Sequence, residues 1–121
     1  MKKVWYYMNG DKTTAKIVFD KIEETVEVEN YSDNLFELPF GFYKPRWENF
    51  LHLLEYRCFP KTRRNCKEIL RILEIPCYNY YLIINRTRGY MENDDFWFRE
   101  EGSDMTYADV KNLKYNSGRT E

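Results

Sequence analysis

The stretch EYRCFPKTRRNCKEIL, residues 55–70, ends one apolar pattern and begins another, with Pro60 between the two. Four cationic residues lie close to this proline, namely Arg57, Lys61, Arg63 and Arg64. A proline ends a helix because it lacks the backbone N–H and because its ring clashes with the preceding turn. The stretch therefore predicts an elbow between two helices, and its charge raises the question of whether the elbow is also a binding surface.

Helical spacing is present on both sides of this elbow. Before it, Pro45 occupies a position where a first-turn proline is tolerated, and six apolar residues follow the i, i+3, i+4, i+7 pattern: Trp47, Phe50, Leu51, Leu53, Leu54 and Cys58. After it, Thr62 is the predicted cap of a second helix that Pro76 ends, with an apolar face of Cys66, Ile69, Leu70 and Leu73. The residues predicted to enter the core are Trp47, Leu51, Leu54, Ile69, Leu73 and, from a later strand, Trp97.

The segment YNYYLIINRT, residues 78–87, fits either a buried strand or a short helix. We favour a helix, because Asn79 is a suitable cap for its first turn. Arg86, Arg88 and Gly89 are also typical of the C-terminal end of a helix.

The N-terminal part of the chain has the alternation of β-strands. Residues 4–8, 14–19 and 22–28 are strand candidates, and Asn-Gly-Asp at 9–11 is a turn signal between the first two. Glu24 interrupts the apolar face of the third candidate, which leaves its register open. The three runs predict an antiparallel meander with one face toward water.

The C-terminal part predicts a short strand at 96–98 and a last helical turn at 106–110. Ser103 or Asp104 can cap that turn. Residues after Tyr115 have the composition of a frayed tail.

These elements predict one α+β domain over residues 1–116, followed by a flexible tail at 117–121. A small antiparallel β-sheet is expected to be packed by two or three α-helices. The loop at 30–45 carries five apolar residues and is expected to fold back onto the core. With 121 residues, 43% of them hydrophobic, the chain is long enough to bury a core without disulfides or metals.

Composition also bounds the compartment and the partners. The three cysteines, Cys58, Cys66 and Cys77, have the spacing of neither a disulfide framework nor a zinc motif, so we expect free thiols in the cytoplasm. No run approaches the roughly 20 apolar residues of a membrane span. The net charge of −1 provides no global attraction to nucleic acid or membrane, so such binding would need a local patch.

Charge is distributed unevenly along the chain. One segment contains a single acid, Glu68, and six cations: Arg57, Lys61, Arg63, Arg64, Lys67 and Arg71. Another segment contains a single cation, Arg99, and six acids: Glu92, Asp94, Asp95, Glu100, Glu101 and Asp104. We favour the interpretation that the two segments meet within the fold, with Asp94 and Asp95 as structural ion-pair partners. The alternative is that the arginines face outward and bind phosphate or a partner's carboxylates.

No complete catalytic constellation is present in the sequence. Asp94 and Asp95 are adjacent on a strand entry, so their side chains point to opposite faces and do not form a joint metal site. His52 has no nucleophile or orienting acid in a recognisable pattern, and we interpret it as a structural histidine. The glycines are isolated and form no phosphate-binding loop. We therefore expect no catalytic residues, no metal and no cofactor.

The aromatic residues point toward binding. The chain has more aromatic residues than a core of this size needs, among them Trp5, Tyr6, Tyr7, Tyr31, Tyr43, Tyr80, Tyr81 and Trp97. Some are therefore expected at the surface, where Tyr, Trp and Arg are favoured as interface anchors.

The order of motifs along the chain carries a family resemblance. An acidic strand VEVENY (26–31) precedes the R-x-x-P-x-x-R elbow (57–63) and the helix CKEILRIL, and DDFWFR (94–99) and MTYADVK (105–111) follow. This order resembles the region that precedes the kinase domain in HipA-like proteins of Firmicutes and their mobile elements. The similarity spans roughly residues 1–116, although Phe96 replaces the usual tyrosine and Tyr107 the usual tryptophan.

The resemblance implies an accessory module rather than a kinase. The chain ends where the kinase would begin and has no catalytic Asp motif, so we expect no kinase activity. In split HipA-type toxin systems, a small protein similar to this region binds the kinase in trans and restrains it. Isolated modules of this sort also occur among prophage genes, whose products often act by binding host proteins, including CRISPR effectors. The resemblance thus implies a bacterial protein partner, either a toxin kinase or a host defence protein. Nucleic-acid binding through the basic segment 57–71 is the second choice.

Overall fold

The computed structural model describes residues 1–117 and has an α+β architecture, as predicted. Its sheet contains the strands β1 (Lys3–Asn9), β2 (Lys12–Asp20), β3 (Thr25–Asn30) and β4 (Phe96–Glu100) in the order β3-β2-β1-β4. All neighbouring strands are antiparallel. The N-terminal meander is therefore confirmed, and the C-terminal strand joins it beside β1.

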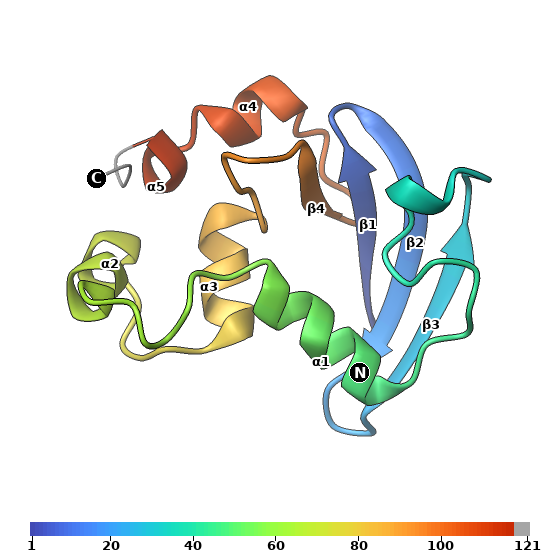
Figure 1. Ribbon diagram of the computed structural model, residues 1–121, viewed down its shortest axis with the longest axis horizontal. Coiled ribbons are helices and arrows are strands. Elements are labelled where there is room, and N and C mark those ends of the chain that lie inside the picture. Colours follow the sequence, from blue (N-terminus) through green and yellow to red (C-terminus); the bar gives the residue numbers. More distant parts are fainter. Residues whose placement is uncertain (118–121) are drawn as a thin grey trace.

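Helices occupy one side and one end of this sheet (Figure 1). The longer helices are α1 (Trp47–Tyr56), α2 (Cys66–Leu73) and α3 (Tyr80–Thr87). α1 and α3 lie beside the sheet, and α2 lies farther from it, beyond α3. The short helices α4 (Tyr107–Lys111) and α5 (Lys114–Ser117) cross the end of the molecule near β4, and a 3₁₀ turn, η1 (Leu35–Glu37), follows β3.

The third strand begins later than predicted. Asp20 Oδ1 accepts the backbone N–H groups of Ile22 and Glu23 at 2.9 and 3.1 Å, which closes a turn at the end of β2. Glu24 then adopts a left-handed backbone conformation, with φ of 57°. Ile22 is consequently exposed, and β3 starts at Thr25. The predicted strand at 22–28 was wrong over its first three residues, because the Asp20 carboxylate makes a turn there.

The main core lies between the sheet and the helices. Its fully buried side chains include Ile17, Phe19, Phe50, Leu54, Leu73 and Ile83. Of the predicted core residues, Leu54, Ile69, Leu73 and Trp97 are buried, whereas Trp47 and Leu51 are only half-buried. Trp97 packs with Met8 and Val110 in a second cluster beneath α4, while its neighbour Phe98 packs in the main core. Adjacent strand residues point to opposite faces, so β4 joins both clusters.

The end of the chain differs from the prediction. Thr106, and neither Ser103 nor Asp104, caps α4: its hydroxyl accepts the N–H of Asp109, and the Asp109 carboxylate accepts the N–H of Thr106. Helical structure also continues past Tyr115, where the frayed tail was predicted to begin, because α5 extends to Ser117. The rest of the predicted tail, 118–121, lies outside the described residues.

α3 and α2 illustrate how capping decides these boundaries. Asn79 accepts the N–H groups of Tyr81 and Leu82, so the helix prediction for this segment is confirmed. Thr62 does not cap α2: the chain instead makes turns in which Arg63 N–H donates to Pro60 and Cys66 N–H to Arg63. These turns lengthen the elbow between α1 and α2 to 57–65.

The loop at 30–45 packs onto the sheet only in part. Leu38 is buried, but Leu35, Phe36 and Phe42 are exposed. The loop is fastened through Glu37, a buried carboxylate that accepts hydrogen bonds from Asn9 at 3.0 Å, Lys12 at 2.7 Å and Ser32 at 2.6 Å. These donors lower the pKa of Glu37 to about 2, with the hydrogen bond from Lys12 as the largest cause.

Glu37 is therefore expected to make stability depend on acid. Because its pKa is lowered in the folded state, its contribution is fully present above its ordinary pKa of 4.5 and is lost as the pH falls toward about 2. The variant Glu37→Gln should be clearly less stable than the wild type at pH 6, and the gap should shrink at pH 3. Urea unfolding at both pH values measures this difference. Glu55→Gln, at an exposed position on α1, should not change with pH in this way. A gap for Glu37→Gln that stays constant with pH would contradict the assignment.

Candidate functional site

The six cations predicted as a binding segment separate into one buried and five exposed residues. Arg57, at the end of α1, is 2% exposed. Its Nη1 and Nη2 atoms donate to the two carboxylate oxygens of Asp94 at 2.7 and 2.9 Å. Its Nε and Nη2 atoms also donate to the carbonyls of Gly89 at 2.9 Å and Phe96 at 2.7 Å. The predicted ion pair between the elbow and Asp94 is present, and the burial of Arg57 removes it from the binding candidates.

Gly89 is what allows this contact. It has φ of 73°, a left-handed conformation that favours glycine, and a Cβ atom there would lie 2.7 Å from the Phe98 ring. Only a glycine therefore fits between α3 and β4 at the point where its carbonyl meets Arg57. In the sequence it was recognised only as a helix-ending signal.

Asp95 has a different partner from Asp94. Its Oδ1 accepts a hydrogen bond from the Tyr107 hydroxyl at 2.7 Å. Burial raises the pKa of Tyr107, and the hydrogen bond to Asp95 adds to that rise. The two carboxylates therefore have partners on different elements, although both residues lie in the bend that precedes β4 and not in the strand itself. Within residues 1–117, no three His, Cys, Asp or Glu side chains are grouped so that they could hold a metal ion.

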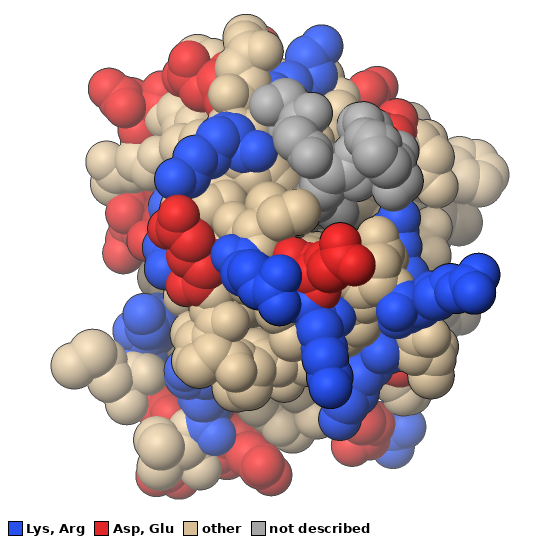
Figure 2. All heavy atoms as spheres, turned by 90° about the vertical axis from the view of Figure 1, so that its left-hand side faces the viewer, with Lys and Arg blue, Asp and Glu red and all other residues tan. Residues whose placement is uncertain are grey.

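The five other cations form what we call the α2 basic surface: Lys61, Arg63, Arg64, Lys67 and Arg71. All five are exposed, and within residues 1–117 none of their side chains makes a salt bridge or a hydrogen bond. Figure 2 views the molecule from this side and shows Lys and Arg side chains spread over it. Of the six cations in the basic segment, only Arg57 is therefore paired with the acidic segment within residues 1–117, through Asp94. Glu100, another acid of that segment, pairs with Arg88 instead.

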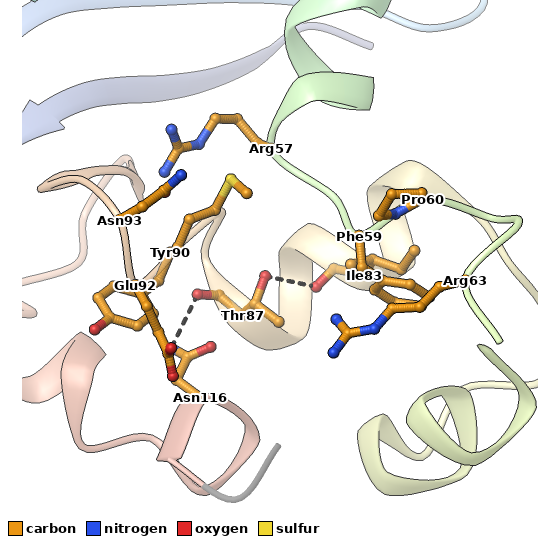
Figure 3. Close-up of a pocket in the computed structure, with 11 residues that line it drawn as sticks. Arg57, Phe59, Pro60, Arg63, Ile83, Thr87, Tyr90, Glu92, Asn93 and Asn116 are labelled. Carbon is orange, nitrogen blue, oxygen red and sulfur yellow. Dashed lines mark hydrogen bonds between the residues drawn. The ribbon is translucent and has the colours of Figure 1, made fainter. Parts of the chain in front are cut away.

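A cavity of about 320 Å³ adjoins this surface. One wall is the elbow, with Phe59, Pro60 and Arg63, and the opposite wall contains residues 90–93 and Asn116 (Figure 3). Ile83 and Thr87 of α3 form its floor. The sequence identified Arg63 as a candidate here but not Asn116, which was placed in a frayed tail.

His52 is not the structural histidine that was expected. It is exposed on α1, and within the described chain its side chain has no hydrogen bond or salt bridge. It lines a shallow groove of about 590 Å³ together with Tyr43 and Tyr56, which are 82% and 66% exposed.

Surface aromatics are present, as predicted, but they are partly different residues. Trp5, Tyr7 and Trp97 are buried. The most exposed aromatic side chains come from the loop after β3 and from the end of α1: Tyr31, Phe36, Phe42, Tyr43 and Tyr56. Most of them therefore lie near β3, at the opposite end of the molecule from α2.

No family model, curated protein or solved structure matches this chain. The resemblance to the pre-kinase region of HipA-like proteins therefore stays a prediction. Among the described helices, none has the length and apolar character needed to cross a membrane.

Proposed function

We propose that this protein acts by binding another protein and not by catalysis. Its role would be that of an antitoxin-like or prophage-encoded regulator or inhibitor, with a bacterial toxin kinase or a host defence protein as its partner. The bacterial setting and the class of partner rest on the HipA-like resemblance. The binding role rests on the α2 basic surface.

The α2 basic surface is the single observation that carries the proposal. Five exposed cations without partners in residues 1–117 lie over one helix and its elbow, in a protein of net charge −1. Arg63 and Arg64 suit a partner with surface carboxylates, because guanidinium groups bind carboxylates through paired hydrogen bonds. Such complementarity accelerates association and selects among partners.

Nucleic-acid binding is the second candidate, and the same five cations favour it. Proteins that bind single strands combine a basic groove with aromatic side chains on which bases stack. Here most of the exposed aromatic side chains lie at the other end of the molecule (Figure 1). The overall charge also provides no general attraction to phosphate. Protein binding is therefore the better supported of the two.

The test first isolates and identifies the partner by pull-down with the purified protein. It then measures binding to the purified partner. The wild type should saturate near one-to-one, with no turnover of nucleotides or peptides. Charge reversal by Arg63→Glu and Arg64→Glu should weaken binding roughly tenfold or more, because like charges then face each other. The matched control is Lys2→Glu with Lys44→Glu, two exposed lysines away from α2. Equal effects of both pairs would contradict the α2 basic surface as the contact.

Salt distinguishes the two candidates. A protein interface with buried anchors should keep much of its affinity at high salt. Binding to DNA or RNA oligonucleotides through phosphates should instead fall steeply with salt concentration. Tight oligonucleotide binding that collapses between 50 and 200 mM salt, concentrations chosen to span this range, would support the nucleic-acid candidate and count against ours.

A further inference from the structure

The cavity beside α2 has opposite charges on its two walls. Arg63, exposed and without a salt bridge in residues 1–117, contributes the positive wall. Glu92, also exposed and without a described partner, contributes the negative wall on the opposite side (Figure 3). The two therefore face the same space without neutralising each other in a salt bridge.

Asn116 adds a buried acceptor to the negative wall. It is 3% exposed, and its Nδ2 atom donates to the carbonyls of Val110 at 2.7 Å and Thr87 at 3.2 Å. These two bonds fix the orientation of the amide, so the other atom is the acceptor Oδ1. Within residues 1–117, Oδ1 receives no hydrogen bond. A buried acceptor without a donor is costly, and native structures rarely leave one unexplained.

The cavity also has an apolar part, although Thr87 adds a polar group to its floor. Ile83 is buried in it, and Phe59 and Met91 also line the cavity. Its volume of about 320 Å³ is at the lower end of the range for small-molecule sites, roughly 300–1,000 Å³. The space thus suits a small ligand with an apolar part.

We propose that this cavity binds a free apolar α-amino acid. The carboxylate of the ligand pairs with Arg63, its ammonium group donates to Asn116 Oδ1 near Glu92, and its side chain lies on Ile83 and Met91. Because Oδ1 is covered, binding of the ammonium requires a local side-chain movement that opens this atom to the cavity. This site is independent of the protein partner proposed above, apart from the shared use of Arg63.

The test uses purified protein alone and three probes of the same shape. L-leucine carries both charged groups, L-leucinamide lacks the carboxylate, and 4-methylpentanoate lacks the ammonium. Leucine should give saturable shifts in ¹H–¹⁵N spectra at the Asn116 side-chain amide and at residues 90–93. Each of the other probes should bind at least about tenfold more weakly, because each loses a hydrogen bond to a charged group.

Variants locate the site. Arg63→Met should reduce leucine affinity roughly tenfold, whereas Arg64→Met, also exposed but outside the cavity lining, should leave it unchanged. Both positions are at the surface, so both variants should fold. Absence of saturable shifts with leucine, equal binding of the three probes, or equal effects of the two variants would each overturn the proposal. Failure of leucine binding leaves the protein-binding test unaffected, since that test requires no small molecule.

Discussion

Replacing Arg57 by methionine is expected to lower the free energy of unfolding by about 3–5 kcal/mol, the usual loss when one partner of a buried ion pair is removed. The Arg57 side chain is fully buried, and it supplies four hydrogen bonds, two to Asp94 and one each to Gly89 and Phe96. Methionine keeps the apolar stem but leaves these acceptors without their donor. Urea unfolding of the purified variant measures the loss. Natural domains are stable by only about 5–15 kcal/mol, so a loss of this size removes a large part of the total stability.

Arg63→Met is the matched control for this prediction. Arg63 is the second arginine of the same R-x-x-P-x-x-R motif, and it is exposed without a salt bridge in residues 1–117. Its replacement should change the free energy of unfolding by less than about 0.5 kcal/mol. Similar losses for the two variants would show that the Arg57 contacts contribute no more than an exposed charge.

The sequence predicted those parts of the fold in which a local signal agrees with the tertiary packing. Asn79 is such a case, since the same side chain that identified the start of α3 accepts two of its free N–H groups. Pro60 is another, because the lost donor ends α1 whatever surrounds it. Leu54 and Leu73 are fully buried, as their helical spacing indicated.

Predictions were wrong where one side chain is compatible with two different local structures. Asp20 could have continued the β pattern, but its carboxylate bonds the next N–H groups and makes a turn. Thr62 has the chemistry of a cap, yet the chain after Pro60 makes successive turns and starts α2 only at Cys66. Such competition depends on contacts that no short window of sequence contains.

The candidate site shows a different limit. Arg57 and Arg63 look equivalent in the sequence, six residues apart in one basic run. Arg57 is nevertheless buried and Arg63 exposed. Gly89, far along the chain, leaves room for its carbonyl to approach and bind Arg57. Asn116 was overlooked because a polar residue near a chain end has no signal for burial. Charge composition thus identified the segment, but tertiary contacts decide which of its cations remain available to a partner.

Leu73→Ala should cost about 2–5 kcal/mol of unfolding free energy, because it leaves a cavity in the main core where α2 packs. Leu73 has no exposed surface, and Ile69, one turn earlier, is 2% exposed. The preceding residue provides the control. Ile72 is 45% exposed on the same helix, so Ile72→Ala removes as many atoms with about half the loss of burial and should cost less than about 1 kcal/mol. Reversible thermal or urea unfolding of both variants measures the difference.

The same pair of variants connects packing to the proposed function. Leu73 fixes the inner face of the helix whose outer face carries Lys67 and Arg71. Loosening α2 should therefore weaken partner binding even though no charge is altered, whereas Ile72→Ala should leave the cations in place. Similar stability losses for the two variants would show that the inner face of α2 is misassigned. A destabilised Leu73→Ala protein that still binds its partner with full affinity would show that the partner contacts another surface, because the positions of the α2 cations depend on this packing.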